Sequence, residues 1–142
     1  SQSFNARGAR VLLVDDHHVN RELGYALLTL GGHEATTAED GAAAVAMVRD
    51  QDFDLVLMDV HMPVMDGLAA THAIRAMQGH KARVPILALS ADVMPEQVAR
   101  CLAAGMDGYL AKPIVRDALL ESVARFTMSA APDENRSSLA NH

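Results

Sequence analysis

Five short apolar runs alternate with longer segments of helical periodicity along this chain, and this alternation limits the fold more than any other feature. The strongest runs, VLLV and LVLM, contain no polar position. Strands that are apolar on both faces are typical of parallel sheets with helices on both sides. We therefore expect five strands, at residues 10–14, 34–38, 54–58, 84–89 and 108–110.

The segments between the runs carry signals for helices. Asp40 and Asp66 are placed to cap the second and third helices, and Pro95 suits the first turn of the fourth. Strict alternation with short connections favours right-handed crossovers, so the pattern predicts an α/β, flavodoxin-like (βα)5 fold, doubly wound around a five-stranded parallel sheet of order 2-1-3-4-5. In the first helix, the apolar residues spaced as one face, which we expect to be buried, are Val19, Leu23, Ala26, Leu27 and Leu30.

Length and charge narrow the class of protein. The 142 residues suffice for one domain, which we place at 9–128, between a flexible N-terminal segment at 1–8 and a flexible tail or linker at 129–142. The formal net charge of −6 argues against direct contact with nucleic acid, because phosphate contacts need clustered Lys and Arg. The apolar runs are too short to insert into a membrane, and the first residues lack the apolar core of a signal peptide, so we expect a cytoplasmic location.

Polar and charged side chains stand directly after four of the apolar runs. Asp15 and Asp16 follow the first run, Asp59 the third, Ser90 the fourth and Lys112 the fifth. Because the carboxyl ends of parallel strands meet at one edge of a sheet, we expect these side chains to gather there. Carboxylate oxygens are the ligands that Mg²⁺ prefers, so the three acids predict a Mg²⁺ site, with Mn²⁺ as a substitute.

The same arrangement predicts that Asp59 can accept a phosphoryl group. Three acids this close repel one another, and a bound cation relieves the repulsion and leaves Asp59 ionised as a nucleophile. A phosphoryl group on Asp59 would carry charge on three oxygens. The cation, the Lys112 ammonium, and the Ser90 hydroxyl together with a backbone N–H offer one partner to each oxygen.

Four motifs carry a family resemblance. VLLVDD, DLVLMDVHMPVMDG, PILALSA and YLAKP, in this order between residues 10 and 126, resemble the motifs of response regulator receiver domains of two-component signalling, most of all the receivers of hybrid sensor histidine kinases. The resemblance implies Mg²⁺-dependent transfer of a phosphoryl group to Asp59 from a histidine kinase or a histidine phosphotransfer domain, and no turnover of an external substrate. Whether the chain is part of a membrane-bound hybrid kinase or a single-domain regulator stays open.

The resemblance also assigns roles to single residues. It implies that the main-chain carbonyl of His61 completes the metal ligands, that Ser90 and Tyr109 are the switch residues, and that His61 and Asp92 occupy positions that set the phosphoryl lifetime. Phosphorylation is expected to switch the face formed by the fourth helix, the fifth strand and the fifth helix. Partner docking is expected on the first helix and at residues 113–114, and a weak homodimer is left open.

Three alternatives remain beside this interpretation. His17, His18 and His61 place imidazoles near the site, either as loop residues lining an oxygen-ligand pocket or as ligands of a transition metal. An aspartyl-phosphate enzyme of the dehalogenase type would need an aspartate two residues after the nucleophile, where this chain has His61. A receiver-like module that only docks would have lost Asp59, the acidic pair or Lys112, and none is lost. The isomer of the Lys112–Pro113 bond is also open.

Overall fold

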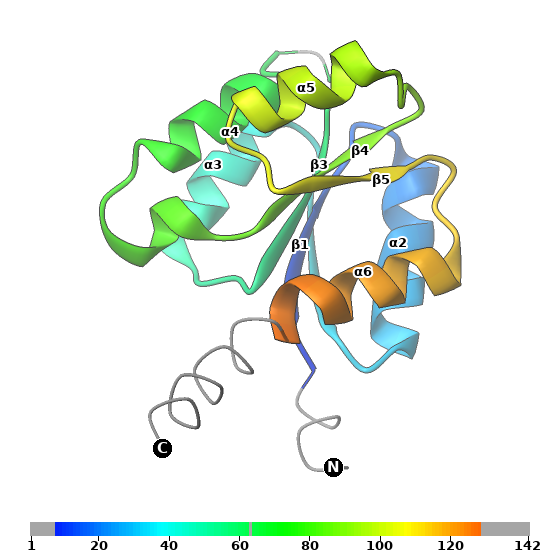
Figure 1. The fold of residues 1–142 in the computed structure, drawn as a ribbon. Helices are drawn as coiled ribbons and strands as arrows, with labels where there is room; N and C mark the ends of the chain where they lie inside the picture. Colours follow the sequence, from blue (N-terminus) through cyan, green and yellow to red (C-terminus); the bar gives the residue numbers. More distant parts are fainter. Residues whose placement is uncertain (1–7, 63, 129–142) are drawn as a thin grey trace, which may run out of the picture.

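The computed structural model, described for residues 8–62 and 64–128, has five parallel strands in the order β2-β1-β3-β4-β5 (Figure 1). This confirms the predicted doubly wound, flavodoxin-like fold. The predicted flexible ends, 1–8 and 129–142, lie outside the described residues except for Gly8. The elements are β1 (Arg10–Val14), α2 (His18–Leu30), β2 (Glu34–Ala38), α3 (Gly41–Asp50), β3 (Leu55–Asp59), α4 (Gly67–Arg75), the 3-10 segment η1 (Gly79–Arg83), β4 (Ile86–Ser90), α5 (Pro95–Ala103), β5 (Gly108–Ala111) and α6 (Arg116–Met128).

Helices cover the sheet on both faces, and each face has its own apolar core. Figure 1 shows α3, α4 and α5 on one side of the sheet and α2 and α6 on the other. Alternate residues of β1 separate accordingly: Leu12 packs with the first group of helices and Leu13 with the second. Strands buried on both sides explain why these runs are continuously apolar.

Most of the helix boundaries follow the predicted signals. The carboxylate of Asp40 accepts a hydrogen bond from the Ala43 N–H at 2.8 Å, and that of Asp66 accepts one from the Ala69 N–H at 2.9 Å. Each bond satisfies a backbone donor that the first turn of a helix leaves free, so both predicted caps are confirmed. Pro95 is the first residue of α5, also as predicted.

The predicted buried face of α2 is wrong. Val19, Leu23 and Leu30 are 72%, 41% and 81% exposed, whereas the buried residues of this helix are Gly24 and Leu28. The reason is the close approach of the helix to β1: a Cβ atom on Gly24 would clash with the Leu13 side chain. The helix therefore turns its smallest residue to the sheet, one position away from the apolar stripe that the sequence shows. Val19, Leu23 and Leu30 of that stripe face outward, whereas Leu27 is half-buried and packs against the core.

Three strands, β3, β4 and β5, end one residue later than predicted, and for β3 and β4 this matters for the site. β3 ends at Asp59 and β4 at Ser90, so both side chains stand on the last residue of a strand rather than in a loop. Backbone hydrogen bonds still hold the chain there, because the Val60 N–H donates to Leu89 O and the Lys112 N–H to Ser90 O. No helix within the described ranges combines the length and apolar character that a membrane crossing requires.

Candidate functional site

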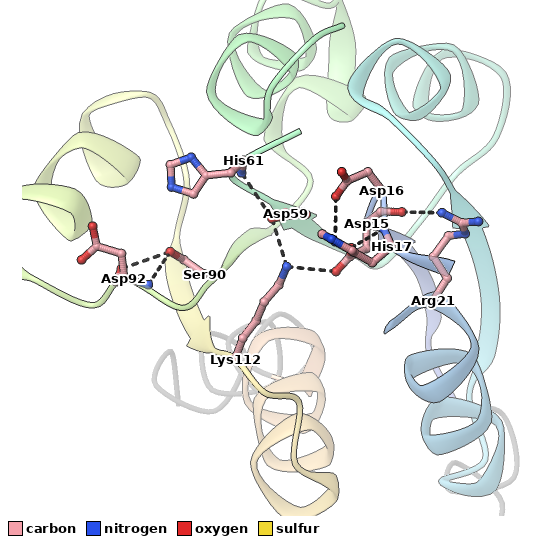
Figure 2. Close-up of polar contacts among 9 residues, drawn as sticks. All are labelled: Asp15, Asp16, His17, Arg21, Asp59, His61, Ser90, Asp92 and Lys112. Atoms are coloured by element: carbon pink, nitrogen blue, oxygen red, sulfur yellow. Dashed lines mark hydrogen bonds and ion pairs between the residues drawn. The ribbon is translucent and has the colours of Figure 1, made fainter. Parts of the chain in front are cut away.

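An ammonium group and two buried carboxylates are in direct contact at the carboxyl edge of the sheet. Lys112 Nζ lies 3.1 Å from Asp15 Oδ2 and 3.2 Å from Asp59 Oδ1, as Figure 2 shows. Asp15 directly follows β1, Asp59 is the last residue of β3, and Lys112 directly follows β5. The long lysine side chain crosses the end of β4 to reach both acids. The strand order thus brings together three residues that are up to 97 positions apart in the sequence.

The backbone around Asp59 is fixed by the start of α4. The Gly67 N–H donates to Val60 O at 3.0 Å, and the His61 N–H donates to Asp59 Oδ1 at 3.2 Å. Gly67 touches the Asp59 carbonyl so closely that a Cβ atom at this position would clash with it. A glycine is therefore required here by close backbone approach. The contacts from Gly67 and His61 therefore hold the Asp59 backbone and its carboxylate in place.

When no cation is bound, Asp59 holds a proton more tightly than a solvated aspartate does. Burial and then the Asp15 charge raise the pKa of Asp59, Lys112 partly offsets both effects, and the resulting pKa is about 6. Burial by itself lowers the pKa of Lys112, but the Asp59 and Asp15 carboxylates outweigh burial, so that this pKa is raised above its usual value. One ammonium faces two acids, so the site carries less positive charge than its ionised carboxylates would need for neutrality.

The acids fit a divalent cation. Ligand atoms of Asp15, Asp16, His17 and Asp59 all lie within 4.8 Å of one another. Asp59 is 2% exposed, and its Oδ2 accepts no hydrogen bond from any described residue. A buried carboxylate oxygen without a partner is costly, and a hard cation with oxygen ligands would satisfy it.

Three other predicted residues, Ser90, Asp92 and His61, have the orientations that Figure 2 shows. The Ser90 hydroxyl turns toward Asp92: it donates to Asp92 O at 3.1 Å and accepts from the Asp92 N–H at 3.0 Å. The His61 side chain is exposed and points away from Asp59. Tyr109 is 46% exposed on β5 and directed outward. The Lys112–Pro113 bond, left open by the sequence, is cis.

Two residues reach the site by contacts that the sequence reasoning did not assign. Arg21 donates from Nη1 to the Asp15 main-chain oxygen at 2.8 Å. His17 lies 3.2 Å from Asp16 Oδ1 through its Nδ1, while its N–H donates to Asp15 Oδ1 at 2.8 Å. The sequence signal for Arg21 is weak, because only its place one turn into α2 and six residues after Asp15 marks it. His18, by contrast, lies outside the cluster and pairs with Glu22 at 3.1 Å.

Comparison with known proteins gives a consistent result. The family profile of the response regulator receiver domain matches residues 11–124. The sensor protein GacS of Pseudomonas syringae pv. syringae is 42% identical over 145 aligned residues, which cover 98% of this chain and 16% of GacS. The sensor histidine kinase AruS of Pseudomonas aeruginosa is 44% identical over 110 residues, 77% of this chain and 11% of AruS. The chain thus spans less than a fifth of these relatives.

Among solved structures, the receiver domain of sensor histidine kinase PA1611 from Pseudomonas aeruginosa PAO1 superposes with a TM-score of 0.78 at 42% identity, covering 84% of this chain and 98% of that domain. That structure holds a magnesium ion coordinated in its active-site cleft.

Proposed function

The chain belongs to the family of response regulator receiver domains, and on this premise we propose that it accepts a phosphoryl group on Asp59 in a His-to-Asp phosphorelay. The observation that carries the proposal is the buried Asp59 carboxylate, held against the Lys112 ammonium beside two further acids. In the reaction, a carboxylate oxygen of Asp59 forms a bond to phosphorus as the N–P bond of a phosphohistidine breaks. The electron pair of that bond stays on the leaving imidazole nitrogen.

The proposed metal ligands are the side chains of Asp15, Asp16 and Asp59 and the main-chain carbonyl of His61. Mg²⁺ at this place, or Mn²⁺ as its substitute, would neutralise the acids and the charge of the incoming phosphoryl group. Support comes from Asp59 Oδ2, which has no hydrogen-bond donor among residues 8–62 and 64–128, and from the spacing of the ligand atoms. The magnesium ion in the PA1611 receiver is a further reason to choose this cation.

Lys112 and Ser90 are the residues that we propose to stabilise the phosphoryl group. Lys112 Nζ already contacts Asp59 Oδ1, so its charge is in place before the reaction. The Ser90 hydroxyl makes two hydrogen bonds to the Asp92 backbone and must break both to reach an oxygen of a phosphoryl group on Asp59. His61 and Asp92 stand two residues beyond Asp59 and Ser90, and we propose that they set the phosphoryl lifetime.

The proposed output is a shift between two conformations of the α5–β5–α6 face. Movement of Ser90 toward the phosphoryl group frees the space beside it, and Tyr109, which is now directed outward from β5, turns into that space. Phosphorylation thereby biases an equilibrium that exists without it. The domain, at residues 9–128, catalyses its own phosphoryl transfer and hydrolysis.

The proposed partner is a histidine kinase or a histidine phosphotransfer domain that docks on α2. The exposed apolar residues Val19, Leu23 and Leu30 give this helix a surface suited to an apolar helical partner. The neighbouring loop contributes Pro113 and Val115, which are exposed, whereas Ile114 is buried in the core. A parent chain of the hybrid-kinase type, tethered to a membrane or not, is compatible with this arrangement. A weak homodimer would use the α5–β5–α6 face.

The test is the intact mass of the protein after incubation with Mg²⁺ and a small acyl-phosphate donor. We expect one phosphoryl adduct that requires Mg²⁺ and is absent from Asp59→Asn. A folded wild type without an adduct, both with this donor and with a phosphohistidine donor, would instead indicate a module that only docks.

A further inference from the structure

We propose that His17 supplies a nitrogen ligand to the cation site, so that the cluster of Asp15, Asp16, His17 and Asp59 also takes transition-metal ions such as Co²⁺, Ni²⁺ or Zn²⁺. The inference concerns the site of the proposed function and rests on it only in placing a divalent cation there. It adds a nitrogen donor of the protein to the oxygen donors of that site.

The geometry of His17 is the first argument. Its Nδ1 lies 3.2 Å from Asp16 Oδ1 and 3.5 Å from Asp15 Oδ1. His17 stands at the N-cap position of α2, yet its side chain makes no capping hydrogen bond. The imidazole is therefore not used by the helix. Its backbone N–H, bonded to Asp15 Oδ1 at 2.8 Å, keeps the residue beside the acids.

The second argument is independent of the histidine. Asp59 is 2% exposed, its Oδ2 accepts no hydrogen bond within the described part of the chain, and it belongs to the same group of ligand atoms within 4.8 Å. Such an oxygen is costly to bury without a partner, and a bound cation would satisfy it. The site thus suits a cation independently of His17, and His17 would determine which cations it prefers.

The chemistry of the donor set indicates the cations. Mg²⁺ prefers an octahedron of hard oxygen ligands and gains little from imidazole. Imidazole nitrogen suits Zn²⁺, Ni²⁺ and Co²⁺, and the affinity of a mixed nitrogen and oxygen site for divalent ions generally rises through the first row toward Cu²⁺. Three carboxylates and one imidazole therefore favour these ions over Mg²⁺. Because Asp59 is a shared ligand, such an ion would compete with Mg²⁺ for the site.

The experiment is a titration of the full chain with Co²⁺, followed by visible absorption and by calorimetry, with Mg²⁺ titrated separately. We expect that His17→Ala and His17→Asn each weaken Co²⁺ binding about tenfold or more, because even the loss of a residue that only supports a metal ligand costs about tenfold in affinity. The Mg²⁺ affinity of both variants should stay within about twofold of the wild-type value. His18→Ala is the matched control, because the side chains of His17 and His18 are both 69% exposed and His18 pairs with Glu22 instead of the cluster. It should leave Co²⁺ binding unchanged.

Equal Co²⁺ affinity and spectrum in the wild type and in both His17 variants would overturn the proposal and leave His17 as an ion-pair partner of the two acids. Circular dichroism establishes that each variant is folded, and the Asn variant keeps the polarity of the position if Ala does not fold. The outcome for the proposed function is read separately, as the Mg²⁺-dependent phosphoryl adduct of the wild type. His17-dependent Co²⁺ binding without a phosphoryl adduct would contradict the proposed function alone. A phosphoryl adduct without any effect of His17 on Co²⁺ binding would contradict the His17 proposal alone.

Discussion

Replacing Asp59 by asparagine should stabilise the fold when no divalent cation is present. The pKa of Asp59 is raised to about 6 in the folded protein, mainly by burial, from 3.8 in a solvated chain. Ionised Asp59 is therefore costly in the folded state. At about 1.4 kcal/mol per pH unit, the difference between these values corresponds to roughly 3 kcal/mol of lost stability at pH values well above 6. The asparagine side chain would carry no charge, but it would also lose the ion pair with Lys112, so we expect a gain of about 1 to 3 kcal/mol.

The sign of the pH dependence provides the check. Because the folded state binds the Asp59 proton more tightly than the unfolded state, the wild type loses stability as the pH rises from about 4 through 6. The advantage of Asp59→Asn should thus be largest at pH 8 and should disappear near pH 4. Urea denaturation with a chelator at both pH values measures this, and Asp50→Asn, an exposed acid at the end of α3, is the control.

Added Mg²⁺ should reduce the difference, because a ligand that binds only the folded wild type raises its stability by mass action. An Asp59→Asn variant that is no more stable than the wild type at pH 8 without metal would refute the reasoning. It would mean that the ion pair with Lys112 outweighs the burial of the carboxylate.

Three further predictions concern residues outside the cluster. Gly67→Ala should destabilise the fold by about 1 to 3 kcal/mol and slow phosphoryl acceptance, because the added methyl meets the Asp59 carbonyl; urea denaturation and adduct formation measure the two effects. Arg75→Ala should cost about 2 to 4 kcal/mol in urea denaturation, since this side chain donates to Ala82 O, Val84 O, Gly105 O and Asp107 Oδ2 at 2.8 to 3.0 Å and joins the segment at the end of η1 to the α5–β5 loop. Burial lowers the pKa of His33, and its Nδ1 accepts a hydrogen bond from the Ala9 N–H at 3.0 Å. Protonation of His33 should therefore destabilise the fold as the pH falls below 6.5, and His33→Gln should remove that part of the pH dependence of stability between pH 7.5 and 5.

Each of these has an opposite outcome that is easy to recognise. Gly67→Ala with an unchanged rate of adduct formation would show that α4 does not fix Asp59. Arg75→Ala should be compared with Arg49→Ala, an exposed arginine, and equal stability losses would contradict the network. A pH profile that is the same for His33→Gln and the wild type would assign the loss of stability at low pH to other groups.

The sequence predicted the fold and the convergence of the site residues because both depend on topology. Continuous apolar runs that alternate with helices favour a parallel sheet, and a parallel sheet brings the residues that follow its strands to one edge. Asp15, Asp59 and Lys112 could therefore be grouped without knowing one distance. The family resemblance supplied the rest of the roles, which stay proposals until the adduct is measured.

What the sequence did not predict depends on packing. The buried face of α2 is set by the fit of Gly24 against Leu13, which hydrophobic periodicity does not contain. The orientation of the Ser90 hydroxyl depends on the turn at Asp92, and that of His17 on the backbone angle at the start of α2. These are side-chain choices among a few rotamers, and no pattern of residue types fixes them.

The position of Lys112 after the last strand has a consequence for synthesis of the protein. A ribosome has added β1 and β3, with the carboxylates of Asp15 and Asp59, long before it reaches residue 112. Until then, no ammonium is available at this edge for the two acids, which repel each other as soon as the strands pair. A nascent chain that has not yet received β5 should therefore hold its first three strands only loosely, or hold them around a cation. The addition of β5 and Lys112 should thus complete the sheet and the site in the same step of folding.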